Sequence, residues 1–269
     1  MTADPAAFTG SVPEYYDRYM GPVFFDHYAT DLVARARPDL RGEVLELACG
    51  TGRLTGPLLA GLPAGARLTA TDLHPPMIEH ARSRLPGDPR LAFEPADAMA
   101  LPFPSGRFDA VLCQFGVMFF PDKIAASGEV RRVLRPGGVY HFNVWCSHVD
   151  NRSIEIVQRL MVELYPADPP RFYEVPFSYC DPALIHADLE RAGFRSIAVT
   201  PVETVSVAET ARHVATGLIR GTPGAGFIAE RGIPGHDEVI DVLSTRLAAF
   251  GGESPCRLEH KALAVRAVA

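Results

Sequence analysis

The sequence predicts an α/β protein built on a doubly wound, Rossmann-like sheet. Apolar segments of strand length alternate with helical segments along the chain, and this rhythm is typical of a parallel sheet flanked by helices. In the stretch EVLELACGTGRLT, Glu43 to Thr55, an acid (Glu46) stands in a buried strand just ahead of a glycine-rich turn. A strand, a glycine turn and a helix start together form a site for a nucleotide-like ligand.

Local sequence patterns, such as residues that favour helix ends, predict where each helix and strand lies along the chain. Pro75 stands where a helix start tolerates a missing N–H, and Asp181 and Gly193 mark the two ends of a later helix. The expected helices are 11–37, 52–60, 75–85, 123–134, 152–165, 181–194 and two stretches within 207–250 around the loop 221–235. The expected strands are 43–48, 66–73, 91–98, 107–120, 137–145, 195–205 and 257–268.

Composition narrows the class of protein. The chain of 269 residues is 47% hydrophobic and 22% charged, which suits one large globular domain or a domain with a lid. A net charge of −6 without a basic run argues against nucleic acid or a membrane surface as the main partner. No apolar run could span a bilayer, and the N-terminus lacks a signal-peptide pattern.

The cysteines and lysines indicate the compartment and the source. Five scattered cysteines without a CxxC pair predict neither a disulfide framework nor a metal site, so we expect a reducing cytoplasm. Only two lysines, with many alanines, indicate a GC-rich bacterial source.

Two classes of ligand compete for the glycine turn. A dinucleotide fold requires G-x-G-x-x-G, but this chain offers Ala48, Gly50 and Arg53, so the first and third positions fail. An acid at the end of the strand would also repel two phosphates, whereas a cationic ligand would tolerate it. An NAD(P)-dependent oxidoreductase therefore remains only as the alternative.

The turn resembles the first motif of class I S-adenosylmethionine (SAM)-dependent methyltransferases, [DE]-x-G-x-G-x-G. The resemblance is closest to the ubiquinone/menaquinone-biosynthesis type and related small-molecule methyltransferases. Here the motif reads Glu46, Ala48, Gly50, Thr51 and Gly52, with Ala48 a small residue in place of the first glycine. The resemblance implies that Glu46 faces the methionyl end of SAM.

Further motifs extend the resemblance over roughly residues 40–146. Asp72, twenty residues after Gly52, matches the acid that accepts both ribose hydroxyls. A carboxylate suits this task because its two oxygens match the two donors of a diol. The resemblance implies a strand order of 3-2-1-4-5-7-6 with an antiparallel last strand. It assigns the other cofactor contacts to Leu73 and Met77 against the adenine, Asp97 with Ala98 at its amino group, and Gln114, Phe115 and Gly116 beneath the sulfonium.

The remaining segments are expected to cover the acceptor. Residues 1–40 would form a helical lid, 147–180 an insertion lining the acceptor pocket and 207–252 a helical insertion, around core segments 41–146, 181–206 and 253–269. In related enzymes a tyrosine of the first segment contacts SAM, and Tyr19 is our choice, with packing as the alternative. Met118, Phe119 and Trp145 would wall the acceptor, although Met118 and Phe119 could equally be core.

The predicted function is transfer of a methyl group from SAM to a small apolar or aromatic acceptor, leaving S-adenosylhomocysteine. A hydroxyl oxygen is the first choice of acceptor atom, with carbon and nitrogen left open. His148 follows the fifth strand and is the candidate base, with a surface histidine as the alternative. A SAM-binding partner protein without catalysis is a further alternative, and a homodimer is left open.

Overall fold

The computed structural model describes residues 12–85 and 87–269, and the chain divides into two compact units. The sheet unit comprises residues 28–145, 179–202 and 262–269. The helical unit comprises the described residues of 1–27 together with 146–178 and 203–261. Each unit is described by itself below.

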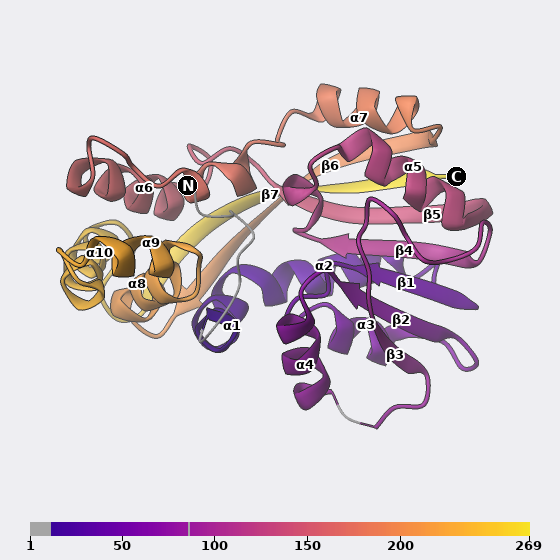
Figure 1. Ribbon diagram of the computed structural model, residues 1–269, viewed down its shortest axis with the longest axis horizontal. Helices are drawn as coiled ribbons and strands as arrows, with labels where there is room; N and C mark the ends of the chain where they lie inside the picture. The colour runs from indigo at the N-terminus through magenta and orange to yellow at the C-terminus, as the bar shows by residue number, and fades with distance from the viewer. Residues whose placement is uncertain (1–11, 86) are drawn as a thin grey trace. The chain divides into compact units, whose positions relative to one another are not determined.

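The seven strands form a single sheet in the order β3-β2-β1-β4-β5-β7-β6 (Figure 1). The β1–β2, β1–β4, β2–β3 and β4–β5 pairs are parallel, and β7 runs antiparallel to β5, so the predicted fold class and strand order are confirmed. The strands are β1 (Glu43–Leu47), β2 (Arg67–Asp72), β3 (Leu91–Pro95), β4 (Phe108–Gln114), β5 (Leu134–Trp145), β6 (Arg195–Ala208) and β7 (Cys256–Val268).

The register places polar residues on one face of the sheet near the carboxyl ends of the parallel strands. Glu46 pairs with Ala70 on β2 and with Leu112 on β4, and Gln114 pairs with Asn143 on β5. Because side chains two residues apart share a face, Glu46, Asp72, Gln114 and Asn143 all project from the same face. This edge is where open α/β sheets bind their ligands.

Helices cover both faces of the sheet unit. Apolar residues of α2 (Asp26–Ala36) and α3 (Thr55–Gly61), among them Leu32 and Leu58, pack with Val44 and Leu112 on the face that carries Glu46. On the other face, Tyr140 packs against Phe194, which follows the helix 182–191, with ring centroids 5.8 Å apart. The remaining helices of this unit are α4 (Pro75–Arg84), the 3₁₀ turn Val117–Phe119, α5 (Lys123–Val133) and α7 (Pro182–Arg191).

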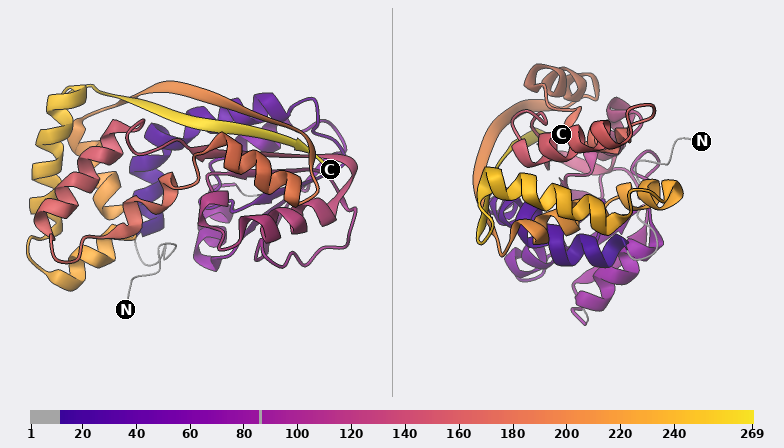
Figure 2. Two further views of the ribbon diagram at one scale, coloured as in Figure 1. Left: turned by 90° about the horizontal axis from the view of Figure 1, so that it is seen from above. Right: turned by 90° about the vertical axis from the view of Figure 1, so that its left-hand side faces the viewer.

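The helical unit contains the segments that interrupt the alternation of strands and helices. Its described helices are α1 (Val12–Tyr15), the π-helical stretch Tyr16–Phe25 that leads into α2, α6 (Arg152–Leu164), the 3₁₀ turns Arg171–Tyr173 and Val175–Phe177, α8 (Ala211–Arg220), α9 (Gly224–Arg231) and α10 (His236–Gly251). Strands β6 and β7 run side by side and contribute residues to both units (Figure 2). Within the described residues, no helix is both long and apolar enough to cross a bilayer.

Several of the expected elements have different bounds in the structure, among them the following three. The expected strand 107–120 ends at Gln114, because Phe115 adopts a left-handed backbone with φ 50°. The expected loop 221–235 contains helix α9, whose Ile228 is fully buried. The turn after α5 belongs to β5, which begins at Leu134. The predicted cap of α7 is confirmed, since the Asp181 carboxylate accepts from the Ala183 N–H at 2.9 Å.

Candidate functional site

The turn after β1 is shaped by left-handed residues. Gly50 has φ 53° and Gly52 has φ 83°, and Ala48 adopts φ 51° although it carries a Cβ. Such a backbone is strained for any residue that carries a Cβ. A Cβ built on Gly50 would meet no atom within 4 Å, whereas one on Gly52 would lie 3.2 Å from Ala81. The backbone at Gly50 is therefore open to close approach by a ligand.

Glu46 is a buried acid without a full set of partners. Its side chain is 1% exposed, and its Oε2 atom has no hydrogen-bond partner among the described residues. The pKa of Glu46 is raised to about 8, chiefly by burial; the Thr55 hydroxyl opposes this rise and the negative charge of Asp72 adds to it. A buried carboxylate in this state is costly to ionise unless a cation lies beside it.

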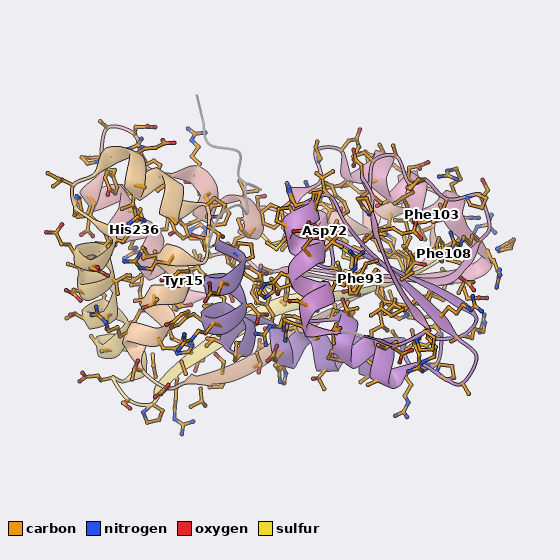
Figure 3. All side chains as sticks on the ribbon, turned by 60° about the horizontal axis from the view of Figure 1, so that its bottom comes forward. Tyr15, Asp72, Phe93, Phe103, Phe108 and His236 are labelled. Carbon is orange, nitrogen blue, oxygen red and sulfur yellow. The ribbon has the colours of Figure 1, made fainter. Side chains whose placement is uncertain are left out.

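Asp72, which is labelled in Figure 3, is the last residue of β2, and its side chain joins that strand to the glycine turn. Its Oδ2 accepts from the Gly50 N–H at 2.8 Å, and its Oδ1 accepts from the His74 N–H at 2.9 Å. Burial raises the pKa of Asp72 even though these two hydrogen bonds oppose the rise. No pattern in the sequence predicted the hydrogen bond between the Asp72 carboxylate and the Gly50 N–H. This bond holds the predicted ribose acceptor beside the open backbone of the turn.

The residues expected around the adenine lie just beyond these strands. Leu73 is 58% exposed and Met77 is buried in α4. Asp97 is exposed, and its Oδ1 accepts from the Met99 N–H at 2.8 Å, so it closes a turn. Ala98 beside it is half-buried. Their contacts with a cofactor stay predictions.

The loop after β4 packs tightly against the glycine turn. The Phe115 N–H donates to the Asn143 carbonyl at 3.1 Å, which links the loop to the end of β5. A Cβ on Gly116 would lie 2.6 Å from the Ala48 Cβ and 2.7 Å from the Cys113 Sγ. The two turns that the sequence predicted at one site are thus in direct contact.

Three aromatic residues meet at this edge of the sheet unit. Phe115 and Trp145 stack face to face with ring centroids 3.9 Å apart. Tyr28 of α2 meets both edge-on, at 5.3 and 5.2 Å. The sequence analysis predicted Phe115 and Trp145 as site residues but not Tyr28. The only indication for Tyr28 was its position in a helix rich in aromatic residues. Met118 is buried and Phe119 half-buried in the 3₁₀ turn that follows.

Two predicted site residues belong to the helical unit. Tyr19 stacks on Tyr15, with ring centroids 5.7 Å apart, and lies 4.8 Å from the ring of His213, so it packs within its own unit. His148 is half-buried in the turn after β5, where its carbonyl accepts from the Asn151 N–H at 3.2 Å. The cofactor contact of Tyr19 and the role of His148 as a base stay predictions.

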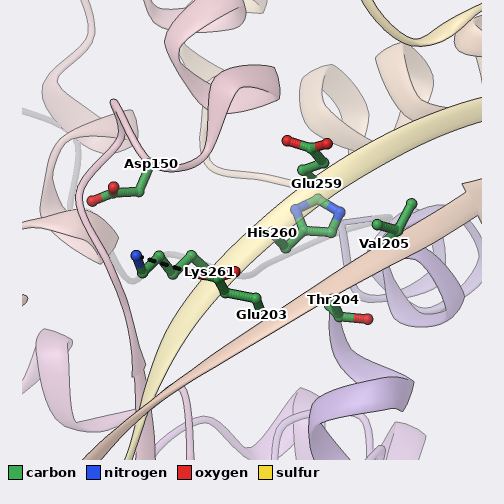
Figure 4. Close-up of a pocket in the computed structure, with 7 residues that line it drawn as sticks. All are labelled: Asp150, Glu203, Thr204, Val205, Glu259, His260 and Lys261. Carbon is green, nitrogen blue, oxygen red and sulfur yellow. Dashed lines mark ion pairs between the residues drawn. The ribbon is translucent and has the colours of Figure 1, made fainter.

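A cavity of about 440 Å³ lies beside the β6–β7 ribbon of the helical unit (Figure 4). Lys261 and Glu203 form an ion pair across its wall at 3.1 Å. His148 is not among the residues that line it, although Asp150 of the same turn is. In the parts of the chain that the structure describes, no cluster of histidine, cysteine or acidic residues could hold a metal ion.

Known proteins resemble the chain over the part that carries this site. Residues 44–138 match the family model described as "Methyltransferase domain". A demethylmenaquinone methyltransferase of Thermus thermophilus is 43% identical over 111 residues, which cover 41% of this chain and 49% of that protein. One of Clavibacter sepedonicus is 42% identical over 105 residues, or 39% of this chain and 42% of that protein. The chain thus spans about half the length, or less, of these relatives.

A solved structure extends the likeness in fold to nearly the whole chain. Phosphoethanolamine N-methyltransferase 2 of Haemonchus contortus, solved in complex with SAM, superposes with a TM-score of 0.61 at 17% identity. The match covers 98% of this chain and 58% of that one. This likeness shows the shared fold. The family model and the two relatives agree with the predicted family, since residues 44–138 carry a methyltransferase domain.

Proposed function

We propose that the chain transfers a methyl group from SAM to a small aromatic acceptor that bears oxygen, releasing S-adenosylhomocysteine. The observation that carries the proposal is the buried Glu46 carboxylate, whose Oε2 has no hydrogen-bond partner among the residues that the structure describes. An ammonium group such as that of the methionyl end of SAM would supply the missing charge and hydrogen bond. A pyrophosphate would not.

The neighbouring residues fit the rest of the cofactor. The Asp72 carboxylate would accept the ribose hydroxyls through lone pairs that the Gly50 and His74 N–H groups leave free. The open backbone at Gly50 leaves room for close approach. When bound, SAM supplies a methyl group that is already activated by a sulfonium.

The main task of the protein is therefore positioning. Holding the two reactants in line can contribute about 7–11 kcal/mol to lowering the barrier. A general base contributes a factor of about 10²–10⁴, or roughly 3–5 kcal/mol. Positioning is the larger effect, so an acidic hydroxyl acceptor needs little assistance from a base such as His148.

The acceptor class rests on two supports. The two relatives described above are named demethylmenaquinone methyltransferases, which favours a quinone-like aromatic compound. Phe115 and Trp145 place buried aromatic rings at the carboxyl ends of β4 and β5, and aromatic rings pack well against one another. A hydroxyl oxygen remains our first choice of acceptor atom, ahead of carbon and nitrogen.

Isothermal titration calorimetry with SAM, S-adenosylhomocysteine and NAD tests the cofactor assignment. We expect heat with the first two ligands and none with NAD. Asp72→Ala should weaken binding of S-adenosylhomocysteine at least tenfold, since it removes two hydrogen bonds to a charged group, each worth about 1.5–3 kcal/mol. Heat with NAD alone would overturn the proposal, and an unchanged dissociation constant in folded Asp72→Ala would remove Asp72 from the site.

A further inference from the structure

Asn143 has a buried side chain that the account above does not use. It lies on β5, is 1% exposed, and neither its Nδ2 nor its Oδ1 atom has a hydrogen-bond partner among the described residues. A carboxamide offers two donors and two lone pairs, and leaving all of them unmet in an apolar interior is costly. Native structures keep such a group where a ligand or an ordered water satisfies it.

The place of Asn143 in the sheet separates it from the proposed ammonium site. It pairs with Gln114, and its carbonyl accepts from the Phe115 N–H. Glu46 lies on β1, two strand spacings away across β4, which is about 10 Å. One ligand group cannot bond to both side chains. Asn143 would therefore serve a different group from the one that Glu46 neutralises.

The surroundings of Asn143 are aromatic on one side and acidic on the other. Trp145, two residues further along the same face of β5, stacks on Phe115. The Asp72 carboxylate projects from the same face and disfavours an anion. The carboxamide is itself neutral, so an isolated charged group would enter without a counter-charge. A neutral oxygen on an aromatic ring fits both its hydrogen-bonding capacity and its neighbours.

We propose that Asn143 recognises the acceptor, with its carboxamide hydrogen-bonded to a keto or hydroxyl oxygen of the aromatic ring. The inference rests on the proposed function and deepens it, because it names the feature of the acceptor that the site selects. An acceptor that bears ring oxygen is preferred over its hydrocarbon counterpart. The preference comes from satisfying the buried amide, which a hydrocarbon would leave unpaired.

Fluorescence provides a test that does not depend on turnover. Trp145 is the only tryptophan of the chain and lies two residues from Asn143, so its quenching reports ligands at this edge. The protein is saturated with S-adenosylhomocysteine and titrated with 2,3-dimethyl-1,4-naphthoquinone or with 2,3-dimethylnaphthalene, which lacks the two oxygens. We expect the quinone to bind at least fivefold more tightly, and Asn143→Leu to abolish this difference by weakening only the quinone.

Matched variants separate recognition from structure. Thr69→Val changes another buried polar residue of the sheet unit and should leave the fivefold preference intact. If Asn143→Leu does not fold, Asn143→Ala is a second variant that lacks the amide. Both Asn143 variants should bind S-adenosylhomocysteine as tightly as the parent, as measured by calorimetry.

The outcomes distinguish this inference from the proposed function. If the parent and a folded Asn143 variant prefer the quinone to the same degree, the inference is overturned. The amide would then be hydrogen-bonded to a structural water instead of the acceptor. Equal affinity of the parent for both compounds overturns the inference as well. Failure of the parent protein to bind S-adenosylhomocysteine would instead overturn the proposed function.

Discussion

Glu46 is a residue whose protonation should report ligand binding. Its pKa of about 8 lies above the ordinary value of 4.5, so the folded, unliganded chain holds this proton throughout the acidic range and up to about pH 8. An ammonium group bound beside the carboxylate would favour its charged form and lower its pKa. Binding of the cofactor should therefore release a proton, and affinity should rise as pH increases toward 8.

Calorimetry in buffers of different ionisation enthalpy measures this linkage. At pH 6.5 to 7.5 we expect release of close to one proton when S-adenosylhomocysteine binds. Glu46→Gln keeps the size of the side chain but cannot ionise, so the part of the proton release due to this group should vanish. Equal proton release in the parent and in Glu46→Gln would show that Glu46 does not face the bound ammonium.

At the scale of elements, the contact between the β1 turn and the β4 loop should be intolerant of added volume. A Cβ on Gly116 would lie 2.6 Å from the Ala48 Cβ and 2.7 Å from the Cys113 Sγ, so one of the two turns must move. Gly116→Ala should lower the free energy of unfolding by about 1–3 kcal/mol and weaken binding of S-adenosylhomocysteine.

Gly128 provides the matched control for that substitution. It lies inside α5, and a Cβ there would meet no atom within 4 Å. Gly128→Ala should raise stability by up to about 1 kcal/mol, because alanine is the better helix former. Chemical denaturation of both variants measures the difference. A Gly116→Ala protein as stable as the parent would contradict the close packing of the two turns.

The sequence predicted the elements whose signals are local and missed those that depend on contacts between distant segments. The motif residues Glu46 and Asp72 followed from their spacing and the resemblance, and the strand order from the resemblance alone. The left-handed backbone of Phe115 did not, because it depends on packing at the end of β5. In the sequence nothing distinguishes Asn143 from an ordinary strand residue. Only the register of the sheet shows that it pairs with Gln114.

Helix α9 illustrates the same limit at the scale of an element. Its stretch GTPGAGF contains the glycine and proline typical of a loop. Tertiary packing overrides this propensity: Ile228 is fully buried, and Phe227 meets Tyr165 edge-on at 5.1 Å. Such contacts join segments more than sixty residues apart, so no local pattern could predict them.

For the whole molecule, a buried histidine should make stability depend on pH. Burial lowers the pKa of His260 to about 4 from 6.5, so it is neutral in the folded chain. The unfolded chain takes up this proton first as pH falls, so the stability from this group is complete above about pH 6.5. It is then lost progressively down to about pH 4. The shift corresponds to about 3 kcal/mol.

Denaturation curves at pH 7, 5.5 and 4.5 measure this loss. His260→Gln keeps a polar group within reach of the Ser206 hydroxyl, which lies 2.8 Å from the His260 Nε2, but cannot be protonated. Its stability should fall less steeply over this range than that of the parent. Parallel pH profiles for the two proteins would show that His260 is not buried in its neutral form.

The central claim is that the site around Glu46 and Asp72 serves methyl transfer, and mass spectrometry of the product tests it most directly. The protein is incubated with SAM carrying a deuterated methyl group and with a panel of quinols, phenols and carboxylic acids. The account predicts that an aromatic acceptor bearing ring oxygen gains one labelled methyl group, with an equal amount of S-adenosylhomocysteine formed and a slower reaction in Glu46→Gln. Folded protein that binds S-adenosylhomocysteine yet transfers no label to any member of the panel would contradict it.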